Sequence, residues 1–276
     1  MSTLKKILIK TKRQIFSEVS GNNSSLFEGE GFDFVELREY NYGDDVRKID
    51  WNVTARMQHP FVKIFREERE LNIAIVSLLG GSVYFGQKRF KQEVMAEVLA
   101  LLAFSAVKNT DTFASYLYAQ GIEQPMRATK NIHAVHKATQ ALLDFNVLGK
   151  KVDSQALGRQ LYERITRRSI IFIVGDFFEE FDFQLLSKKH EVVAIIVRDK
   201  FEENPPELGS INLADPSSYE SRLMQLDSKA VKRYREKLQQ RDHDFYAHCR
   251  KNRVAFTKIY TDEDPFVKLS KLFLKR

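Results

Sequence analysis

The 276-residue sequence has only one cysteine and no long apolar run. A single cysteine, Cys249, cannot form an internal disulfide, and no second cysteine stands at zinc-ligand spacing. No stretch approaches the roughly 18 uninterrupted apolar residues of a membrane span. The N-terminal segment interleaves lysines with leucine and isoleucine, which is unlike a signal peptide. We therefore expect a soluble protein of the cytoplasm.

The charge balance is basic, but it has no strong excess of one sign. Lysine and arginine number 44 against 37 aspartate and glutamate, a net charge of +7. The excess lies mainly at the N-terminus and in the C-terminal third, so charge alone does not predict a nucleic-acid partner. The 43% of hydrophobic residues is enough to bury a core and excludes a disordered chain.

Residues 4–20 predict a short basic amphipathic helix, with Leu4, Leu8, Ile15 and Val19 at helical spacing. The run 21–25, GNNSS, then ends it. Such a helix either lies on a membrane surface or packs on its own domain, and we favour the second interpretation.

Residues 28–70 predict a small strand-rich element, in which a turn at 41–45 separates the β-like runs FDFVELREY and VRKIDW. From residue 71 onward, compact apolar runs alternate with helical segments, as in a mostly parallel sheet with crossover helices. We expect three segments, 1–27, 28–70 and 71–276, and a β-hairpin insertion near 209–224. The expected strands are 72–78, 112–118, 169–175, 191–197 and 253–260. The expected helices are 89–108, 132–145, 154–167, 183–189, 228–251 and 265–273.

The densest group of charged and aromatic residues lies in the strand-rich element. Isolated buried charges are costly, so charges of both signs beside large apolar residues indicate a paired network. We expect its arginines and tryptophan to hold the element to the main domain. The site residues in this group are Arg38, Tyr40, Gly43, Asp44, Asp45, Arg47, Asp50, Trp51 and Arg56.

The aspartates of this group allow a second interpretation. Asp44, Asp45 and Asp50 could serve a hydrolase as acids or metal ligands. However, Gly43 and the two aspartates after it stand at a turn that favours these residue types, and no phosphate loop or nucleophile–base pair accompanies them. We therefore favour a structural or docking role.

The run LREYNYGDDVRKIDWNVTAR, which continues to FVKIFREERE, strongly resembles the signature of the bacterial domain-of-unknown-function family fifty-eight. Members of that family carry a von Willebrand factor A-like domain and are commonly encoded beside MoxR-type AAA ATPases. The resemblance extends over roughly residues 28–276 and implies an α/β fold, a mostly parallel sheet with helices on both faces. Further matches are Gly175-Asp176-Phe177, Arg198-Asp199 with Glu202 and Pro205, and Thr261-Asp262.

The chain departs from this resemblance at the metal site. In metal-binding members of the fold, the first strand ends in Asp-x-Ser-x-Ser, and those positions are Leu78, Gly80 and Ser82 here. Asp176 matches the distal aspartate of the site, although it could equally cap the following segment, and Thr129 is a weak match to the threonine. One carboxylate and one or two hydroxyls leave most of the coordination of magnesium to water, so we expect no metal and no cofactor. His243, His248 and Cys249 do not share a helix face and predict no site.

The resemblance implies a protein-binding adaptor that is not an enzyme. We expect it to bind a MoxR-type AAA ATPase, or a client of that ATPase, in the assembly or maturation of other proteins. The carboxyl edge of the sheet and the strand-rich element are the expected contact surfaces. The alternatives are the hydrolase described above and a membrane-peripheral protein anchored by the basic N-terminal helix.

Overall fold

The computed structural model describes residues 3–17, 34–65 and 70–274. The chain forms two compact units, one of residues Glu28–Leu71 and one of Met1–Phe27 with Asn72–Arg276. We call them the signature unit and the α/β unit, and we describe each by itself.

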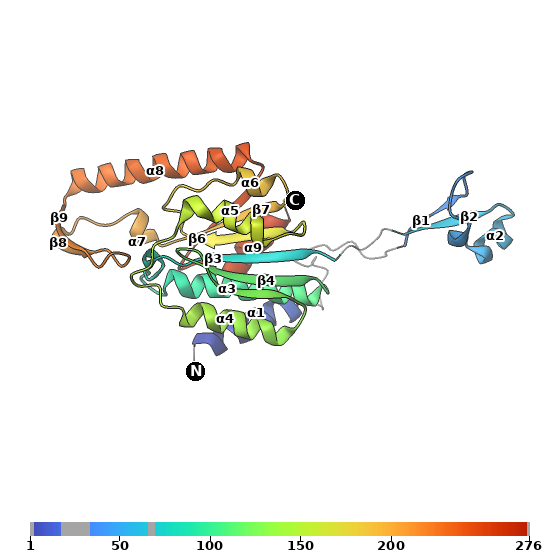
Figure 1. Ribbon diagram of the computed structural model, residues 1–276, viewed down its shortest axis with the longest axis horizontal. Coiled ribbons are helices and arrows are strands. Elements are labelled where there is room, and N and C mark those ends of the chain that lie inside the picture. The colour runs from blue at the N-terminus through green and yellow to red at the C-terminus, as the bar shows by residue number, and fades with distance from the viewer. Residues whose placement is uncertain (1–2, 18–33, 66–69, 275–276) are drawn as a thin grey trace. The chain divides into compact units, whose positions relative to one another are not determined.

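A six-stranded sheet lies at the centre of the α/β unit (Figure 1). Its strands stand in the order β10, β7, β6, β3, β4, β5, and all neighbours are parallel except β4 and β5. This is the 3-2-1-4-5-6 order of a doubly wound sheet. The α/β architecture predicted from the sequence, a mostly parallel sheet with helices on both faces, is confirmed. The strands are β3 (Asn72–Leu78), β4 (Thr112–Tyr118), β5 (Ile122–Thr129), β6 (Ile170–Gly175), β7 (Glu191–Arg198) and β10 (Ala255–Tyr260).

Helices cover both faces of this sheet (Figure 1). On one face α3 lies against the strands, with α1 and α4 packed outside it and α9 beside it. Because α3 is covered on both sides, almost every residue of the run KQEVMAEVLALLAFSAVK is buried. On the other face lie α5, α6 and α8. The helices are α1 (Thr3–Ser17), α3 (Lys91–Lys108), α4 (Ile132–Asp144), α5 (Ser154–Arg164), α6 (Gln184–Ser187), α7 (Lys200–Glu203), α8 (Ser228–Lys251) and α9 (Pro265–Phe273).

The N-terminal helix α1 packs on its own domain, as we favoured. Ile7, Leu8 and Ile15 are buried, and Lys10 Nζ lies 2.5 Å from Oε1 of the buried Glu97 on α3. The predicted residues 18–20, including Val19, lie outside the described part of the chain. Within the described ranges, no helix has the length and apolar character needed to cross a membrane.

The β-hairpin predicted near 209–224 consists of β8 (Gly209–Ala214) and β9 (Ser221–Leu226). Its turn lies on the loop that follows β3. A Cβ atom at Gly81 would lie 2.5 Å from the carbonyl carbon of Pro216, and the Gly149 amide donates to the Pro216 carbonyl at 2.8 Å. The close approach requires glycine at position 81.

The signature unit contains a β-hairpin and short helices. Strands β1 (Phe34–Glu39) and β2 (Phe61–Phe65) pair antiparallel. The segment VRKIDW was predicted to be β-like, and this was wrong: Val46–Lys48 is a 3₁₀ helix, and α2 (Trp51–Met57) begins at the tryptophan. The reason is local, because Asp45 and Asp50 each cap the following turn by accepting backbone N–H groups.

Candidate functional site

The carboxyl ends of β3, β6, β7 and β10 meet at one edge of the sheet, because these strands run parallel. The direction of winding reverses between β3 and β6, and the crevice at such a reversal is where doubly wound folds bind ligands. The residues that follow these strands therefore form the candidate site.

The positions of the metal site at the end of β3 are occupied by core residues. Leu78 is 2% exposed, and its side chain packs against Gly175 at the end of β6. Gly80 is buried, and a Cβ atom there would lie 3.2 Å from a methyl group of Val152. Thr129 is not part of this edge: it pairs with Phe113 near the start of β4, at the opposite end of the sheet. The weak match to a metal-site threonine was wrong.

The carboxylate of Asp176, which follows β6, forms an ion pair with a lysine. Lys91 stands in the first turn of α3, and its side chain has no exposed surface. Its Nζ atom lies 3.0 Å from Oδ2 of Asp176 and 2.7 Å from Oε1 of Glu202. The ring of Phe178 lies 4.9 Å from the same nitrogen. The ammonium group thus has two carboxylates and one aromatic face around it.

Arg198, the last residue of β7, is the second buried cation of the site, and it is 2% exposed. Its Nε donates to the carbonyl of Asp176 at 2.6 Å, and its Nη2 lies 3.3 Å from Oδ1 of Asp242 on α8. The guanidinium carbon lies 3.7 Å from the centre of the Phe178 ring. Phe178 therefore contacts both cations.

The two carboxylates respond differently to this environment. Burial alone would raise the pKa of Asp176, but the charge of Lys91 and hydrogen bonds from Ser82 and Lys91 outweigh it and hold the pKa below its usual range. Burial raises the pKa of Glu202, and Lys91 offsets only part of that effect. Oε2 of Glu202 and Nη1 of Arg198 are buried without a hydrogen-bond partner among the described residues.

The network continues toward β10. Lys258 Nζ lies 2.6 Å from Asp242 and 2.7 Å from Glu203, and the hydroxyl of Tyr260 donates to Glu203 at 2.7 Å. Burial raises the pKa of Tyr260 to about 12, and its bond to Glu203 adds to the shift. These ion pairs and hydrogen bonds connect α7, α8 and β10 at this edge of the sheet.

Family matches that lie far apart in sequence converge here. Asp199 accepts from the Thr261 hydroxyl and from the amides of Gln87 and Phe201. Asp176, Arg198 and Glu202 belong to the network described above. Through these contacts the matched residues connect the loops that follow β3, β6, β7 and β10.

The donor set does not fit the divalent ion of metal-binding relatives of the fold. Leu78 and Gly80 supply no oxygen, and the carboxylate of Asp176 is engaged by an ammonium group. In the described ranges, 3–17, 34–65 and 70–274, no three histidine, cysteine, aspartate or glutamate side chains are placed to hold a metal. His248 instead accepts the Phe183 amide, and Cys249 is buried.

The charged residues of the signature unit pair with one another. Arg38 Nη2 lies 2.9 Å from Asp44, and Arg47 Nε lies 3.1 Å from Asp45. The carboxylate partners of the two arginines lie six and two residues away in the same unit. That this unit is held to the main domain by Arg38, Arg47 and Trp51 stays a prediction.

The aspartates of the signature unit stabilise its turns and the start of α2 by accepting backbone N–H groups. A hydrogen bond from the Asn41 amide, together with Arg38, lowers the pKa of Asp44, and the bond from Arg47 lowers that of Asp45. Asp50 caps α2. Gly43 takes φ +106° in the turn before them. They do not converge as acid and base, and they give no support to a hydrolase.

The exposed residues of this unit include large apolar side chains. Trp51 is 69% exposed, Val46 59% and Met57 58%. Arg56 is also exposed, and Tyr40 is half-buried. Tryptophan and arginine are residue types enriched in protein interfaces.

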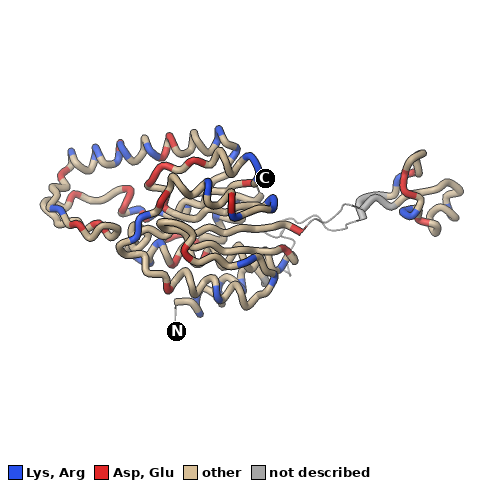
Figure 2. The backbone as a smooth tube through the Cα atoms, in the orientation of Figure 1, with Lys and Arg blue, Asp and Glu red and all other residues tan. Residues whose placement is uncertain are grey.

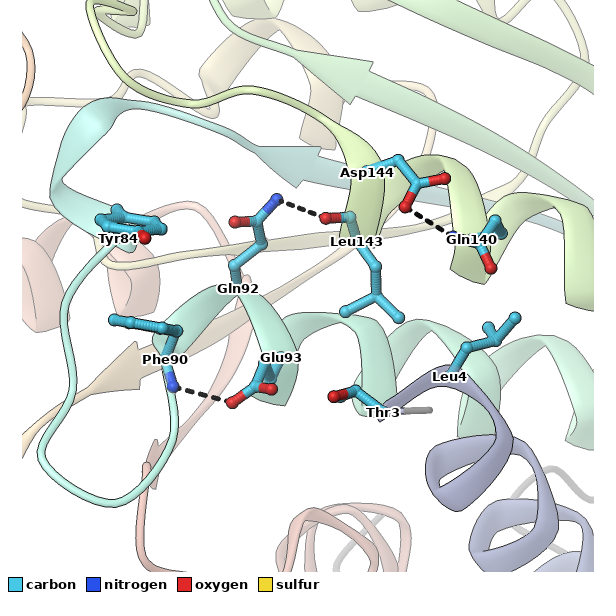
Figure 3. A pocket seen from close by; sticks show the side chains of 9 residues that line it. All are labelled: Thr3, Leu4, Tyr84, Phe90, Gln92, Glu93, Gln140, Leu143 and Asp144. Carbon is cyan, nitrogen blue, oxygen red and sulfur yellow. Dashed lines mark hydrogen bonds between the residues drawn. The ribbon is translucent and has the colours of Figure 1, made fainter. Parts of the chain in front are cut away.

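A pocket of about 330 Å³ lies between the first turns of α1 and α3 and the end of α4 (Figure 3). Tyr84 and Phe90, from the loop after β3, stack at its mouth with ring centres 4.5 Å apart. Figure 3 shows that its two carboxylates are engaged: Glu93 accepts the Phe90 amide, and Asp144 accepts from Gln140. The pocket therefore offers aromatic contact area but no free acid–base pair.

The buried Lys91 was not predicted from the sequence. Lys91 and Glu97 belong to a helix whose middle is apolar on every side, and a charge in such a helix requires a buried partner. That pattern could have predicted a buried ion pair at Lys91. No comparable pattern marks Asp242 and Lys258, because each stands among ordinary surface charges in the sequence.

Comparisons with known proteins agree with the sequence signature. An uncharacterised protein of Mycobacterium tuberculosis and one of Mycobacterium bovis are each 26% identical over 233 residues, 82% of this chain and 74% of theirs. The structure of the conserved hypothetical protein BatB from Bacteroides thetaiotaomicron is similar over 74% of this chain and 98% of its own, with a TM-score of 0.46 and 9% identity. The SpRpn10 VWA domain is similar over 75% of this chain and 96% of its own, with a TM-score of 0.36 and 10% identity. Residues 36–244 match the protein family of unknown function DUF58, and the chain belongs to that family.

Proposed function

We propose that the protein is a non-catalytic adaptor of the cytoplasm that binds a protein partner through the exposed face of its signature unit. The observation that carries this proposal is the exposure of Trp51, the only tryptophan of the chain, in a unit that also exposes Val46, Met57 and Arg56. An aromatic side chain that is 69% exposed contributes little to folding, whereas tryptophan and arginine often dominate the binding energy of an interface.

The carboxyl edge of the α/β unit is the second proposed contact. Tyr84 and Phe90 are 47% and 39% exposed there. The hairpin whose turn packs on the same edge exposes Leu223 and Met224. Loops from several strands converge at this edge, and the buried ion pairs beneath them fix their positions.

The described carboxylates do not favour an enzyme. Asp44, Asp45 and Asp50 cap turns or pair with arginine, and Asp176 is paired with Lys91. A general acid or base needs a free group within reach of a substrate. A protein-binding role requires only the exposed surfaces described above.

The partner that the family resemblance suggests is a MoxR-type AAA ATPase or one of its clients. The proposed role is help in the assembly or maturation of other proteins. The test is a titration of the purified protein with the purified ATPase encoded nearest to it. A non-hydrolysing variant of the ATPase should be used with and without nucleotide, because the ATPase itself needs magnesium.

We expect a saturable complex that persists in a chelator when nucleotide is omitted. Absence of a complex at every concentration reached, in both nucleotide states, contradicts the ATPase as partner. A complex that forms but dissociates in the chelator contradicts a contact made by side chains and backbone alone.

A further inference from the structure

Two carboxylates contact the Lys91 ammonium at the point where winding reverses, and the hydroxyl of Ser82 interacts with one of them. Asp176 follows β6, Glu202 follows β7, and Ser82 lies in the loop after β3. Lys91 binds both carboxylates, and the Ser82 side chain hydrogen-bonds to Asp176. The cation and its oxygen groups thus come from three separate strand ends.

The carboxylates of this buried group are already engaged by protein cations. Lys91 binds Asp176 and Glu202, and Arg198 pairs with Asp242. Protonation of Glu202, which burial favours, would remove one negative charge from the group. A divalent cation would have to compete with Lys91 for Asp176 and Glu202, and it would first have to lose water.

We infer that the ammonium group of Lys91 is a built-in replacement for the divalent cation of metal-binding von Willebrand A-like domains, and that removing this side chain exposes a latent divalent-cation site. The ammonium group serves the same electrostatic purpose, because it joins the carboxylates of two strand ends in a buried place. Unlike a metal, it is permanently attached. This inference does not depend on the proposed partner.

The oxygen groups that remain without Lys91 suit a hard cation. Asp176 and Glu202 supply two carboxylates, Glu202 has one oxygen without a partner, and Ser82 supplies a hydroxyl. Magnesium and manganese bind such sites through one or two carboxylates and complete their coordination with water. The space left by a four-carbon stem would admit those waters.

The test measures Mn²⁺ binding by electron paramagnetic resonance in the wild-type protein, Lys91→Ala and Lys91→Met. Lys91→Ala opens the space, whereas Lys91→Met removes the charge and keeps the space filled. We expect Lys91→Ala to bind Mn²⁺ at least tenfold more tightly than the wild type and Lys91→Met. We also expect its Tm to rise by roughly 5 °C at a Mg²⁺ concentration about 100 times Kd.

The double variant Lys91→Ala/Asp176→Asn should lose both effects, which places the ion at this site. The inference is overturned if the wild type binds Mn²⁺ as tightly as Lys91→Ala and Asp176→Asn abolishes that binding. A folded Lys91→Ala protein that gains no Mn²⁺ affinity overturns it as well.

Removal of a buried charge can prevent folding, so refolding yield is the second readout. A Lys91→Ala protein that refolds in Mn²⁺ or Mg²⁺ but not in a chelator supports the inference. A Lys91→Ala protein that refolds in neither buffer contradicts the latent site.

Discussion

Lys91 and Asp176 form an ion pair across the point where the winding of the sheet reverses, with 3.0 Å between Nζ and Oδ2. One residue follows β3 and the other follows β6, so the pair joins the two halves of the α/β unit. Glu202 adds a third charge at 2.7 Å from the same nitrogen. The carboxylates of this edge are thus paired with an ammonium group, while Leu78 and Gly80 supply no oxygen ligand.

Glu202→Gln should change how stability depends on pH. Burial raises the pKa of Glu202 above its usual 4.5 in the folded protein. Its contribution to stability is therefore complete below about pH 4.5 and is lost as the pH rises through the folded-state pKa. The free energy of unfolding of the wild type, relative to Glu202→Gln, should fall between pH 4 and pH 8, as measured by urea unfolding at each pH. A constant difference, or one that grows with pH, would show that this assignment is wrong.

Arg47→Ala should leave the Tm unchanged within about 1 °C, because exposed ion pairs contribute little. The Arg47 side chain is 88% exposed, and its partner Asp45 also accepts the backbone amide of residue 47, which the substitution retains. Differential scanning calorimetry measures this directly. A large fall in Tm would mean that Arg47 has a buried partner other than Asp45.

Much of the fold could be predicted because its strands are short apolar runs between helical segments. NIAIVSL, IIFIVG and EVVAIIVR are buried on both faces, and such strands read as continuous apolar sequence. Strand β5 was missed because it is an exposed edge strand with a proline at position 125 and no apolar alternation. The sequence pattern therefore identified the strands that are buried on both faces, but not the exposed edge strand β5.

The candidate site was predictable only in part. Asp176 could be found because it directly follows a buried strand, and Arg198 and Glu202 because they match the family. That Lys91 meets both Asp176 and Glu202 depends on how α3 crosses the sheet, which no local sequence pattern reports. The aspartates of the signature unit allowed a hydrolase interpretation because aspartate serves both as a turn or helix cap and as a catalytic carboxylate.

Ile15→Ala should destabilise the protein by about 2 to 3 kcal/mol, because it removes buried apolar volume between α1 and the rest of the α/β unit. Ile15 is 3% exposed. The matched control is Ile9→Ala on the same helix, where the side chain is 46% exposed and the expected change is within about 0.5 kcal/mol. Equal effects of the two substitutions in urea unfolding would contradict the packing of α1.

The 276-residue protein should not co-sediment with anionic vesicles at physiological salt. Ile7, Leu8 and Ile15 of α1 are buried against the protein, which leaves its lysines as the main groups for a membrane surface. Lysine charge alone gives weak adhesion that salt screens. Co-sedimentation that disappears when residues 1–20 are deleted would instead support a membrane anchor. Figure 2 shows that α8 also carries many lysines and arginines, so its charge must be left intact in that comparison.

The most direct test of the adaptor proposal is the Kd of the candidate ATPase for Trp51→Ala and Tyr42→Ala. Both side chains are exposed aromatic residues of the signature unit, but only Trp51 is among the site residues predicted from the sequence. Circular dichroism and Tm establish that both variants remain folded. We expect Trp51→Ala to raise Kd about thirtyfold, the effect of a 2 kcal/mol interface residue, and Tyr42→Ala to change it less than threefold. Equal Kd values for Trp51→Ala and the wild type would contradict binding through the signature unit.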